Sequence, residues 1–199
     1  PVLVDVDPQT FNIDPEAIEN AITPKTKAII PVHLFGQCAE MDAITAIAKK
    51  HNLFVVEDNA QGIGATYTFA DGTKAKTGTL GHVAATSFFP SKNLGAYGDG
   101  GAIFTNDDAL AHFIRGIVNH GMYKRYYHDV VGVNSRLDAL QAAVLKVKLK
   151  YLDFYNERRK EAALRYSEYF KNHPNLVIPS RTGGCNSHVF HQYTMKILK

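Results

Sequence analysis

The feature of this sequence that most restricts its fold is the alternation of apolar, strand-length runs with amphipathic, helix-length segments. The apolar runs are residues 2–7, 27–34 and 53–58, and the helical segments between them are residues 15–22 and 41–51. Strands that are apolar almost throughout and are joined by helices pair in parallel, with helices on both faces of the sheet. The sequence therefore predicts an α/β fold with a mostly parallel sheet and helices on both of its faces.

Two further strands are predicted on either side of a glycine-rich loop. Residues 84–89 and 101–105 are apolar runs, and the loop between them contains the sequence GAYGDGG. The polar segment 68–78 precedes these strands and is expected to form a hairpin or an excursion from the sheet. A helix is predicted over residues 107–119.

A longer helical pattern separates the two domains that we expect. It covers residues 135–172, and Ser135 and Asp138 have the spacing of a capping box. Its apolar stripe consists of Leu137, Leu140, Val144, Val147 and Leu152. We therefore expect the large domain over residues 1–134, a long connecting helix, and the beginning of a small C-terminal domain over residues 173–199, with a first strand at its end in the sequence HQYTMKI. Both chain ends fall inside apolar strands, so we expect a piece of a longer protein whose large domain lacks its N-terminal part.

The composition restricts the classes of partner. The 22 basic and 19 acidic residues are well mixed and give a net charge of +3, so no basic stripe is present that would neutralise a row of phosphates. No apolar run approaches the length of about 20 residues that a membrane span needs. Two distant cysteines, Cys38 and Cys185, suit a reducing compartment better than a disulfide framework. We therefore expect a cytoplasmic protein that binds neither nucleic acid nor membrane.

A carboxylate and an amine are predicted to share one edge of the sheet. Asp58 ends one apolar strand and Lys92 follows another, and ligands of open parallel sheets bind beyond the carboxyl ends of the strands. Taken singly, Asp58 would be a turn residue or a helix cap, and Lys92 a solvated loop lysine. Glu57 should point to the opposite face of the sheet. Together, Asp58 and Lys92 supply the two groups on which pyridoxal phosphate chemistry depends, an acid that keeps a ring nitrogen protonated and an amine that forms an imine.

Four segments of the chain resemble one known family. They are TKAIIPVHLFGQ, VVEDNAQGIGATY, TSFFPSKNLGAYGDGGAIFTND and VGVNSRLDALQAAVLKVKL. They are similar to the DegT/DnrJ/StrS family of pyridoxal-phosphate-dependent nucleotide-sugar aminotransferases, and the resemblance covers almost the whole chain. It implies a fold-type I large domain, a pyridoxal 5'-phosphate cofactor, and the transfer of an amino group from an amino-acid donor, glutamate, to a keto group of a nucleotide-linked sugar.

The resemblance implies roles for five residues at the expected edge. Lys92 would form the imine with the cofactor and move the proton between substrate and cofactor. Asp58 would pair with the ring nitrogen, and Gln61 would donate a hydrogen bond to the phenolic oxygen. Ala60 would pack on the ring face and Ser87 would bind the phosphate. The alternatives for Ala60 and Ser87 are plain core packing and an ordinary polar position in a strand.

Two residues are expected to act across a subunit interface. By the resemblance, Asn134 reaches the cofactor phosphate of the neighbouring subunit, which implies a homodimer with shared active sites; its alternative role is a helix N-cap. Arg136 would contact the substrate from the adjacent subunit and hold a uronate carboxylate through a bidentate pair. The alternative for Arg136 is an ion pair with Asp138.

The resemblance favours one substrate class. The segments GQCAEMDAI and VGVNSRLD most resemble the corresponding segments of enzymes that aminate the 3-keto group of a UDP-linked N-acetylhexosaminuronic acid. The product would enter cell-surface polysaccharide, such as O-antigen, or amino-sugar biosynthesis. The alternative substrates are a 4-keto-6-deoxy sugar nucleotide and a cyclitol. Lys92 argues against the related 3-dehydrase branch, which has histidine at this position.

Other classes of function remain as alternatives. A non-catalytic binding or regulatory protein with the same fold is one of them. A nicotinamide-dependent oxidoreductase is another, but GIGATY lacks the third glycine of a dinucleotide fingerprint. No metal is expected, because the nine histidines include no helical pair at metal-ligand spacing with an acid.

Overall fold

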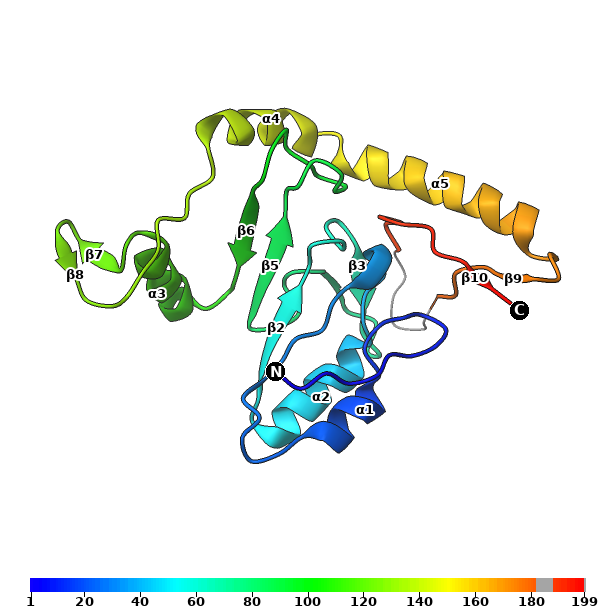
Figure 1. Ribbon diagram of the computed structural model, residues 1–199, viewed down its shortest axis with the longest axis horizontal. Coiled ribbons are helices and arrows are strands. Elements are labelled where there is room, and N and C mark those ends of the chain that lie inside the picture. Colours follow the sequence, from blue (N-terminus) through cyan, green and yellow to red (C-terminus); the bar gives the residue numbers. More distant parts are fainter. Residues whose placement is uncertain (182–187, 199) are drawn as a thin grey trace.

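The computed structural model describes residues 1–181 and 188–198, and its centre is a four-stranded sheet (Figure 1). The strands follow the order β1-β2-β5-β6. Their bounds are β1 (Ala28–Ile29), β2 (Phe54–Asp58), β5 (Val83–Ser87) and β6 (Gly101–Phe104). β2 pairs in parallel with β1 and with β5, while β6 is antiparallel to β5. The predicted α/β fold with a mostly parallel sheet is confirmed.

Two helices lie where the sequence predicts them, α1 (Pro15–Ala21) and α2 (Met41–His51). The carboxylate of Asp14 caps α1 by accepting a backbone hydrogen bond, and the proline at the first helical position has a suitable φ. Asn52 ends α2 in the left-handed region, with φ 52°. Local capping chemistry therefore sets the start of α1 and the end of α2.

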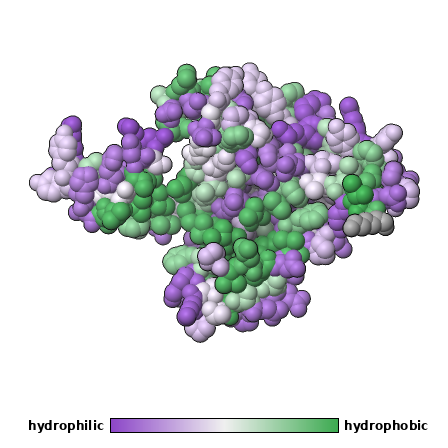
Figure 2. Space-filling model, in the orientation of Figure 1, coloured by the Kyte–Doolittle hydropathy of each residue, from purple (hydrophilic) through white to green (hydrophobic). Residues whose placement is uncertain are grey.

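One face of the sheet is buried against α2. Val55 of β2 packs there in a core that also contains Ile29, Ile44, Ile47, Ala48 and Leu53. The opposite face carries Asp58, whose neighbours on that face include the exposed side chains of Phe54 and Ile103. Figure 2 shows hydrophobic residues gathered across the middle of the molecule. That helices cover this second face as well stays a prediction.

The polar excursion and the next helix also match their predictions. β3 (Thr66–Thr68) and β4 (Lys74–Lys76) form an antiparallel hairpin. The hydroxyl group of Tyr67 in this hairpin is buried and donates a hydrogen bond of 3.0 Å to Asp42. Helix α3 (Asp108–Val118) begins after its cap Asp107. The small antiparallel pair of β7 (Met122–Lys124) and β8 (Tyr127–His128) extends beyond α3 (Figure 1).

The segment expected to be one long helix forms two, α4 (Ala139–Leu149) and α5 (Leu152–Phe170). Between them the N–H of Tyr151 donates to the carbonyl of Lys148 at 2.9 Å, a tightened turn that interrupts the regular helical bonding. No glycine or proline marks this break in the sequence. The expected capping box is not formed either, because the side chain of the N-cap Asp138 makes no cap hydrogen bond. The helix therefore begins later than its capping-box spacing predicts.

The apolar stripe of this segment is only partly buried. Leu140 is 75% exposed, while Leu152 packs with Leu145 of α4 and with Phe88 near the lysine loop. Further on, β9 (Leu176–Val177) pairs antiparallel with β10 (Lys196–Ile197), so the strand expected at the C-terminus is shorter than its sequence pattern. The division into a large domain, a connecting helix and a small domain stays a prediction.

Residues 2–7 do not form the predicted strand of the sheet. Their described pairing is an isolated bridge between Val6 and Ile13. The chain turns back at Asp7, whose carboxylate accepts hydrogen bonds from the next backbone N–H groups. Leu3 is 93% exposed, because no described strand lies beside it. The strand prediction is wrong here, since an apolar run needs a neighbouring strand to complete its hydrogen bonds.

Among the described helices, none combines the length and the apolar character needed to cross a bilayer. Cys38 is buried, and Cys185 lies outside the described residues.

Candidate active site

Asp58 lies at the carboxyl end of β2 with its backbone held on both sides. Its N–H donates to the carbonyl of Pro31 at 2.9 Å, and its carbonyl accepts from the N–H of His33 at 3.0 Å. Its Oδ1 accepts from the N–H of Ala60 at 3.0 Å, and no described donor occupies Oδ2. As strand alternation predicts, Glu57 is fully buried on the other face while Asp58 is half-buried. One carboxylate oxygen is therefore available to a ligand.

Gln61 follows Asp58 in the same turn and has an oriented amide. Its Oε1 accepts a hydrogen bond of 2.6 Å from the backbone N–H of Phe35. Phe35 has a left-handed φ of 59°, which turns this N–H towards Gln61. Because Oε1 of Gln61 already accepts this bond, its Nε2 remains as a donor that has no partner among the described residues. Ala60, between Asp58 and Gln61, is half-buried.

The lysine loop begins at the end of β5. The Oγ of Ser87 accepts from the N–H of Phe89 at 3.2 Å, and the N–H of Lys92 donates to the carbonyl of Phe89 at 2.9 Å. Gly95 closes the loop, because a Cβ there would lie 2.3 Å from the carbonyl oxygen of Pro90. The side chain of Lys92 is half-buried and has no ion-pair partner among the described residues. Its amine is therefore free to react.

The C-terminal segment packs beside this loop. Nδ2 of Asn93 donates to Oδ1 of Asn156 at 2.8 Å and to the carbonyl of Val189 at 3.1 Å, and Nδ1 of His191 lies 3.1 Å from Oδ1 of Asn93. Burial, and then the positive charge of Lys92, lower the pKa of His191 to about 4. A neutral imidazole thus lies beside the candidate catalytic amine. Sequence reasoning did not find it, because the two segments are distant in the chain and no motif links them.

Asn134 and Arg136 lie in the segment between β8 and α4. Asn134 is exposed and pairs in an isolated bridge with Asn119. Its N-cap alternative is wrong, because α4 begins after Asp138. Arg136 is exposed, and its alternative ion pair with Asp138 is not among the ion pairs of the described residues. Neither residue bonds to Asp58 or Lys92 within the described part of this chain.

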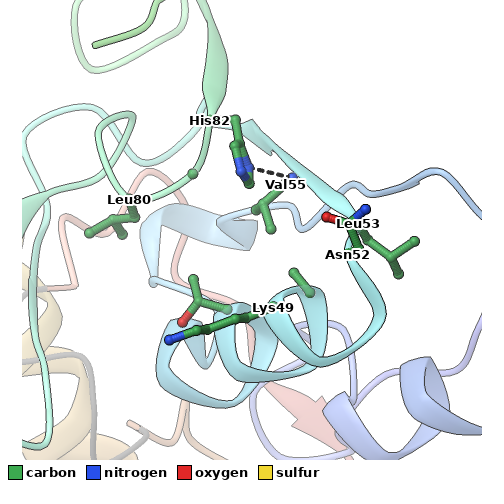
Figure 3. Close-up of a pocket in the computed structure, with 9 residues that line it drawn as sticks. Lys49, Asn52, Leu53, Val55, Leu80 and His82 are labelled. Atoms are coloured by element: carbon green, nitrogen blue, oxygen red, sulfur yellow. Dashed lines mark hydrogen bonds between the residues drawn. The ribbon is translucent and has the colours of Figure 1, made fainter. Parts of the chain in front are cut away.

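A hollow of about 380 Å³ lies at the other end of β2 (Figure 3). It is lined by Thr45, Ala48, Lys49, Asn52, Leu53, Val55, Leu80, Gly81 and His82. Nδ1 of His82 accepts a hydrogen bond of 3.0 Å from the N–H of Val55. Because Val55 is near the start of β2 and Asp58 is at its end, this hollow is separate from the candidate active site. The described residues contain no group of three or more side chains suited to hold a metal ion.

The groups at the carboxyl edge fit pyridoxal phosphate. Its aldehyde needs an uncommitted amine, which Lys92 supplies, and its ring nitrogen needs a carboxylate oxygen, which Asp58 leaves open. A lysine and an aspartate at the carboxyl edge of an α/β sheet are characteristic of enzymes that use this cofactor. The chain belongs to the DegT/DnrJ/EryC1/StrS aminotransferase family, whose sequence profile matches residues 1–199.

Curated relatives in this family have different names. The chain is 54% identical over 200 residues to a pleiotropic regulatory protein of Geobacillus stearothermophilus, with 100% of the chain and 52% of the relative covered. It is 58% identical over 167 residues to a UDP-2-acetamido-2-deoxy-3-oxo-D-glucuronate aminotransferase of Pseudomonas aeruginosa, with 83% of the chain and 45% of the relative covered. The chain thus spans about half the length of these relatives.

Solved structures share this fold. DesV of S. venezuelae, in complex with a ketimine intermediate, superposes with a TM-score of 0.92 at 42% identity, covering 99% of this chain and 52% of that one. NtdA of Bacillus subtilis, with bound cofactor PMP, superposes with a TM-score of 0.85 at 36% identity, covering 99% and 44%. Both agree with the α/β fold described above.

A buried histidine near the site predicts a pH-dependent stability. His188 is 5% exposed, and burial, together with the charge of Arg181, lowers its pKa to about 3. It stays neutral in the folded chain, whereas in the unfolded chain it takes up a proton below its ordinary pKa of 6.5. Its stabilising contribution is therefore complete above about pH 6.5 and falls as the pH drops towards about 3. We expect a loss of about 1 kcal/mol in the free energy of unfolding between about pH 7.5 and about pH 5.5.

Chemical denaturation at the two pH values measures this loss, with His188→Asn as the matched variant. Asparagine can still accept the hydrogen bond that Nδ1 of His188 receives from the N–H of Phe190, but it does not titrate. The variant should lose about 1 kcal/mol less than wild type over this range. Equal losses in the two proteins would show that His188 does not cause the dependence.

Proposed function

We propose that the full-length protein transfers an amino group, with pyridoxal phosphate as cofactor, to a keto group of a nucleotide-linked sugar. The observation that carries this proposal is that Lys92 has no ion-pair partner among the described residues and follows β5 at the sheet edge where Asp58 ends β2. Only one carboxylate oxygen of Asp58 accepts a hydrogen bond from the described residues. When bound, the cofactor supplies an electron sink for the negative charge left when the substrate carbon loses its proton.

The two charged residues have distinct tasks in this proposal. Nζ of Lys92 holds the cofactor and, after release, takes the proton from the substrate carbon and returns it to the neighbouring position. The absence of an ion-pair partner among the described residues leaves this amine uncommitted. Oδ2 of Asp58 keeps a proton on the ring nitrogen by its negative charge, while Oδ1 remains tied to the N–H of Ala60.

Three neutral residues orient the cofactor. Nε2 of Gln61 donates to the phenolic oxygen, and its direction is set by the bond from Phe35 to the other atom of the amide. The hydroxyl of Ser87 contacts the phosphate at the end of β5. The small side chain of Ala60 lets the ring lie against the strand end.

The site is proposed to be completed by a second copy of the chain. Asn134 and Arg136 are exposed and make no described contact with the Lys92 edge of their own chain, which is expected if they serve the neighbouring subunit. The exposed apolar side chain of Leu140 on α4 is suited to a subunit interface. In this arrangement, Asn134 binds the cofactor phosphate and Arg136 holds a substrate carboxylate across the interface.

Shared sites predict complementation between an inactive variant, Lys92→Ala, and a variant with weakened substrate binding, Arg136→Ala. Arg136→Ala is expected to raise the KM for the sugar nucleotide by about tenfold or more, because the variant loses a charge-assisted pair. Refolding an equimolar mixture of Lys92→Ala and Arg136→Ala chains creates hybrid dimers in which one site has both residues. Activity at low substrate concentration should return to about a quarter of wild type. If each chain builds its own site, mixing will restore nothing.

We favour a UDP-linked N-acetylhexosaminuronic acid with a 3-keto group as the substrate and glutamate as the donor. The 58% identity to the Pseudomonas aeruginosa aminotransferase and the exposed cation of Arg136 support this choice. A 4-keto-6-deoxy sugar nucleotide and a cyclitol are the alternative acceptors. The cytoplasm, where sugar nucleotides for cell-surface polysaccharide are made, is the proposed location.

A non-catalytic regulatory protein is the second candidate function. The name of the Geobacillus stearothermophilus relative favours it, whereas Lys92 and Asp58, both present at one edge, favour catalysis.

One experiment separates the two candidate functions. Pyridoxal phosphate is added to the full-length protein, and the absorbance above the protein band is recorded before and after glutamate. An amino transfer enzyme gives a visible band that glutamate removes and that borohydride fixes onto Lys92. Each member of a panel of 3-keto and 4-keto sugar nucleotides is then added, and the band returns only with a sugar nucleotide that accepts the amino group. A regulatory protein without catalysis gives no band that glutamate removes.

A further inference from the structure

Glu57 is a fully buried carboxylate with every acceptor position in use. Its Oε1 accepts from the N–H groups of Leu80 and Gly81, both at 2.6 Å. Its Oε2 accepts from the N–H of Gly78 at 2.7 Å and lies 2.8 Å from Nε2 of His33. Both side chains of the His33–Glu57 pair have 0% exposure. A buried charge of this kind is costly unless all its donors are in place, so its geometry is tightly defined.

The hydrogen bonds also define the tautomer of His33. Its Nδ1 accepts from the N–H of Ala39 at 3.2 Å, so the ring proton is on Nε2 and points to Glu57. Burial acts to raise the pKa of Glu57, but the hydrogen bonds from His33, Gly81 and Gly78 outweigh it and hold the pKa below its usual range. The pair therefore consists of an Nε2–H group that donates to a buried carboxylate.

The backbone of His33 contacts the residue next to Glu57. Its N–H donates to the carbonyl of Asp58 at 3.0 Å, and Val32 forms a parallel bridge with Asp58. His33 thus holds Glu57 through its ring and Asp58 through its backbone. A single residue therefore fixes the end of β2, by a side-chain bond on one face and by a backbone hydrogen bond within the sheet.

The same histidine begins the turn that orients Gln61. Its carbonyl accepts from the N–H of Gly36 at 3.3 Å, and between them Phe35 donates the 2.6 Å bond to Oε1 of Gln61. A Cβ at Gly36 would lie 3.2 Å from the carbonyl oxygen of Gln61, so the two turns are in close contact. A shift of His33 would therefore move the donor that sets the Gln61 amide.

We propose that His33 and Glu57 are positioning residues for the cofactor edge, which hold the carboxylate of Asp58 and the amide of Gln61 in the arrangement that binds the ring. Neither side chain reaches that edge, because both lie on the opposite face of β2. The inference rests on the proposed function, and it assigns a task to a buried pair that the reaction itself does not use.

Two substitutions at His33 separate its two ring contacts. His33→Gln places an amide N–H near the position of Nε2, so it keeps the donor to Glu57 and loses the acceptor for Ala39. His33→Asn keeps an acceptor near Nδ1 and is too short to reach Glu57. Tyr67→Phe is the control for general destabilisation, because it removes a buried hydroxyl that bonds to Asp42, a contact not shared with Asp58 or Gln61.

The readouts are the affinity of the full-length protein for pyridoxal phosphate and the pH midpoint of its visible band. His33→Asn is expected to weaken cofactor binding by about tenfold or more and to shift the midpoint, because partners behind a binding residue typically have effects of this size. His33→Gln should restore most of the affinity and the midpoint. Tyr67→Phe should lower the melting temperature and leave both readouts unchanged.

Other outcomes overturn the proposal. If His33→Asn and His33→Gln are equally affected, or if both match wild type, the bond to Glu57 does not position the edge. If His33→Asn does not fold, Glu57→Gln replaces it, with the same expected weakening. A wild type without the visible band would contradict the proposed function itself and this inference with it, whereas a normal wild-type band with unaffected variants contradicts the inference alone.

Discussion

Lys92→Ala is expected to lower kcat of the full-length protein by about 10,000-fold or more, because one nitrogen atom both holds the cofactor and moves the substrate proton. The visible band of the bound cofactor should be lost or shifted and should no longer be fixed to the chain by borohydride. Lys92→Arg should be equally inactive, since a guanidinium keeps the charge but stays protonated and forms no imine. The measurement is amino transfer from glutamate, together with the absorption spectrum.

The control for Lys92→Ala is Lys25→Ala. Lys25 is likewise a lysine outside the helices and strands, it is exposed, and it is far from β2 and β5 in the sequence. Its replacement should leave kcat and the spectrum unchanged. If Lys92→Ala kept both the band and the turnover, Lys92 would be an ordinary loop charge and the regulatory candidate would stand.

Asp58→Asn is expected to lower kcat by about 100- to 1,000-fold, with a smaller effect on cofactor binding. Asparagine has the same shape and can still accept the hydrogen bond from the N–H of Ala60, so the turn after β2 should keep its form. It has no negative charge, however, and the ring nitrogen would lose the group that keeps it protonated. The glutamate half-reaction, followed by the loss of the visible band in single turnover, measures this step directly.

Asp71→Asn is the matched control for this substitution. Asp71 is also an acid whose Oδ1 accepts a backbone hydrogen bond two residues ahead, from Thr73, and it lies in the exposed hairpin turn. Its replacement should change the rate by less than about twofold. A rate for Asp58→Asn near that of wild type would mean that Asp58 acts only as a turn residue.

Local signals in the sequence predict several elements of the fold well. Asp14 with its following proline predicts the start of α1, and Asp107 predicts the start of α3, because each cap is a bond between near neighbours. The alternation of strand residues also separates Glu57 from Asp58 correctly. These predictions need no knowledge of distant contacts.

Features that depend on distant contacts could not be predicted in this way. Residues 2–7 have a good strand pattern, but no described strand pairs with them. The break at Tyr151 has no glycine or proline to signal it. Of the candidate site, Asp58 and Lys92 follow from their places after strands, while His191 and the His33–Glu57 pair emerge from contacts between separate segments. The assignment of Asn134 and Arg136 to a neighbouring subunit stays a prediction.

The contacts of Asn93 determine when the lysine loop can acquire its final form. They join Asn93 to Asn156, Val189 and His191, which are 63, 96 and 98 residues away. Bonds across such long separations form late, because closing large loops costs entropy before any contact is gained. During synthesis on the ribosome, Lys92 would leave the exit tunnel well before the segment that supports its loop. The reactive amine would therefore reach its working position only after about a hundred more residues have been translated.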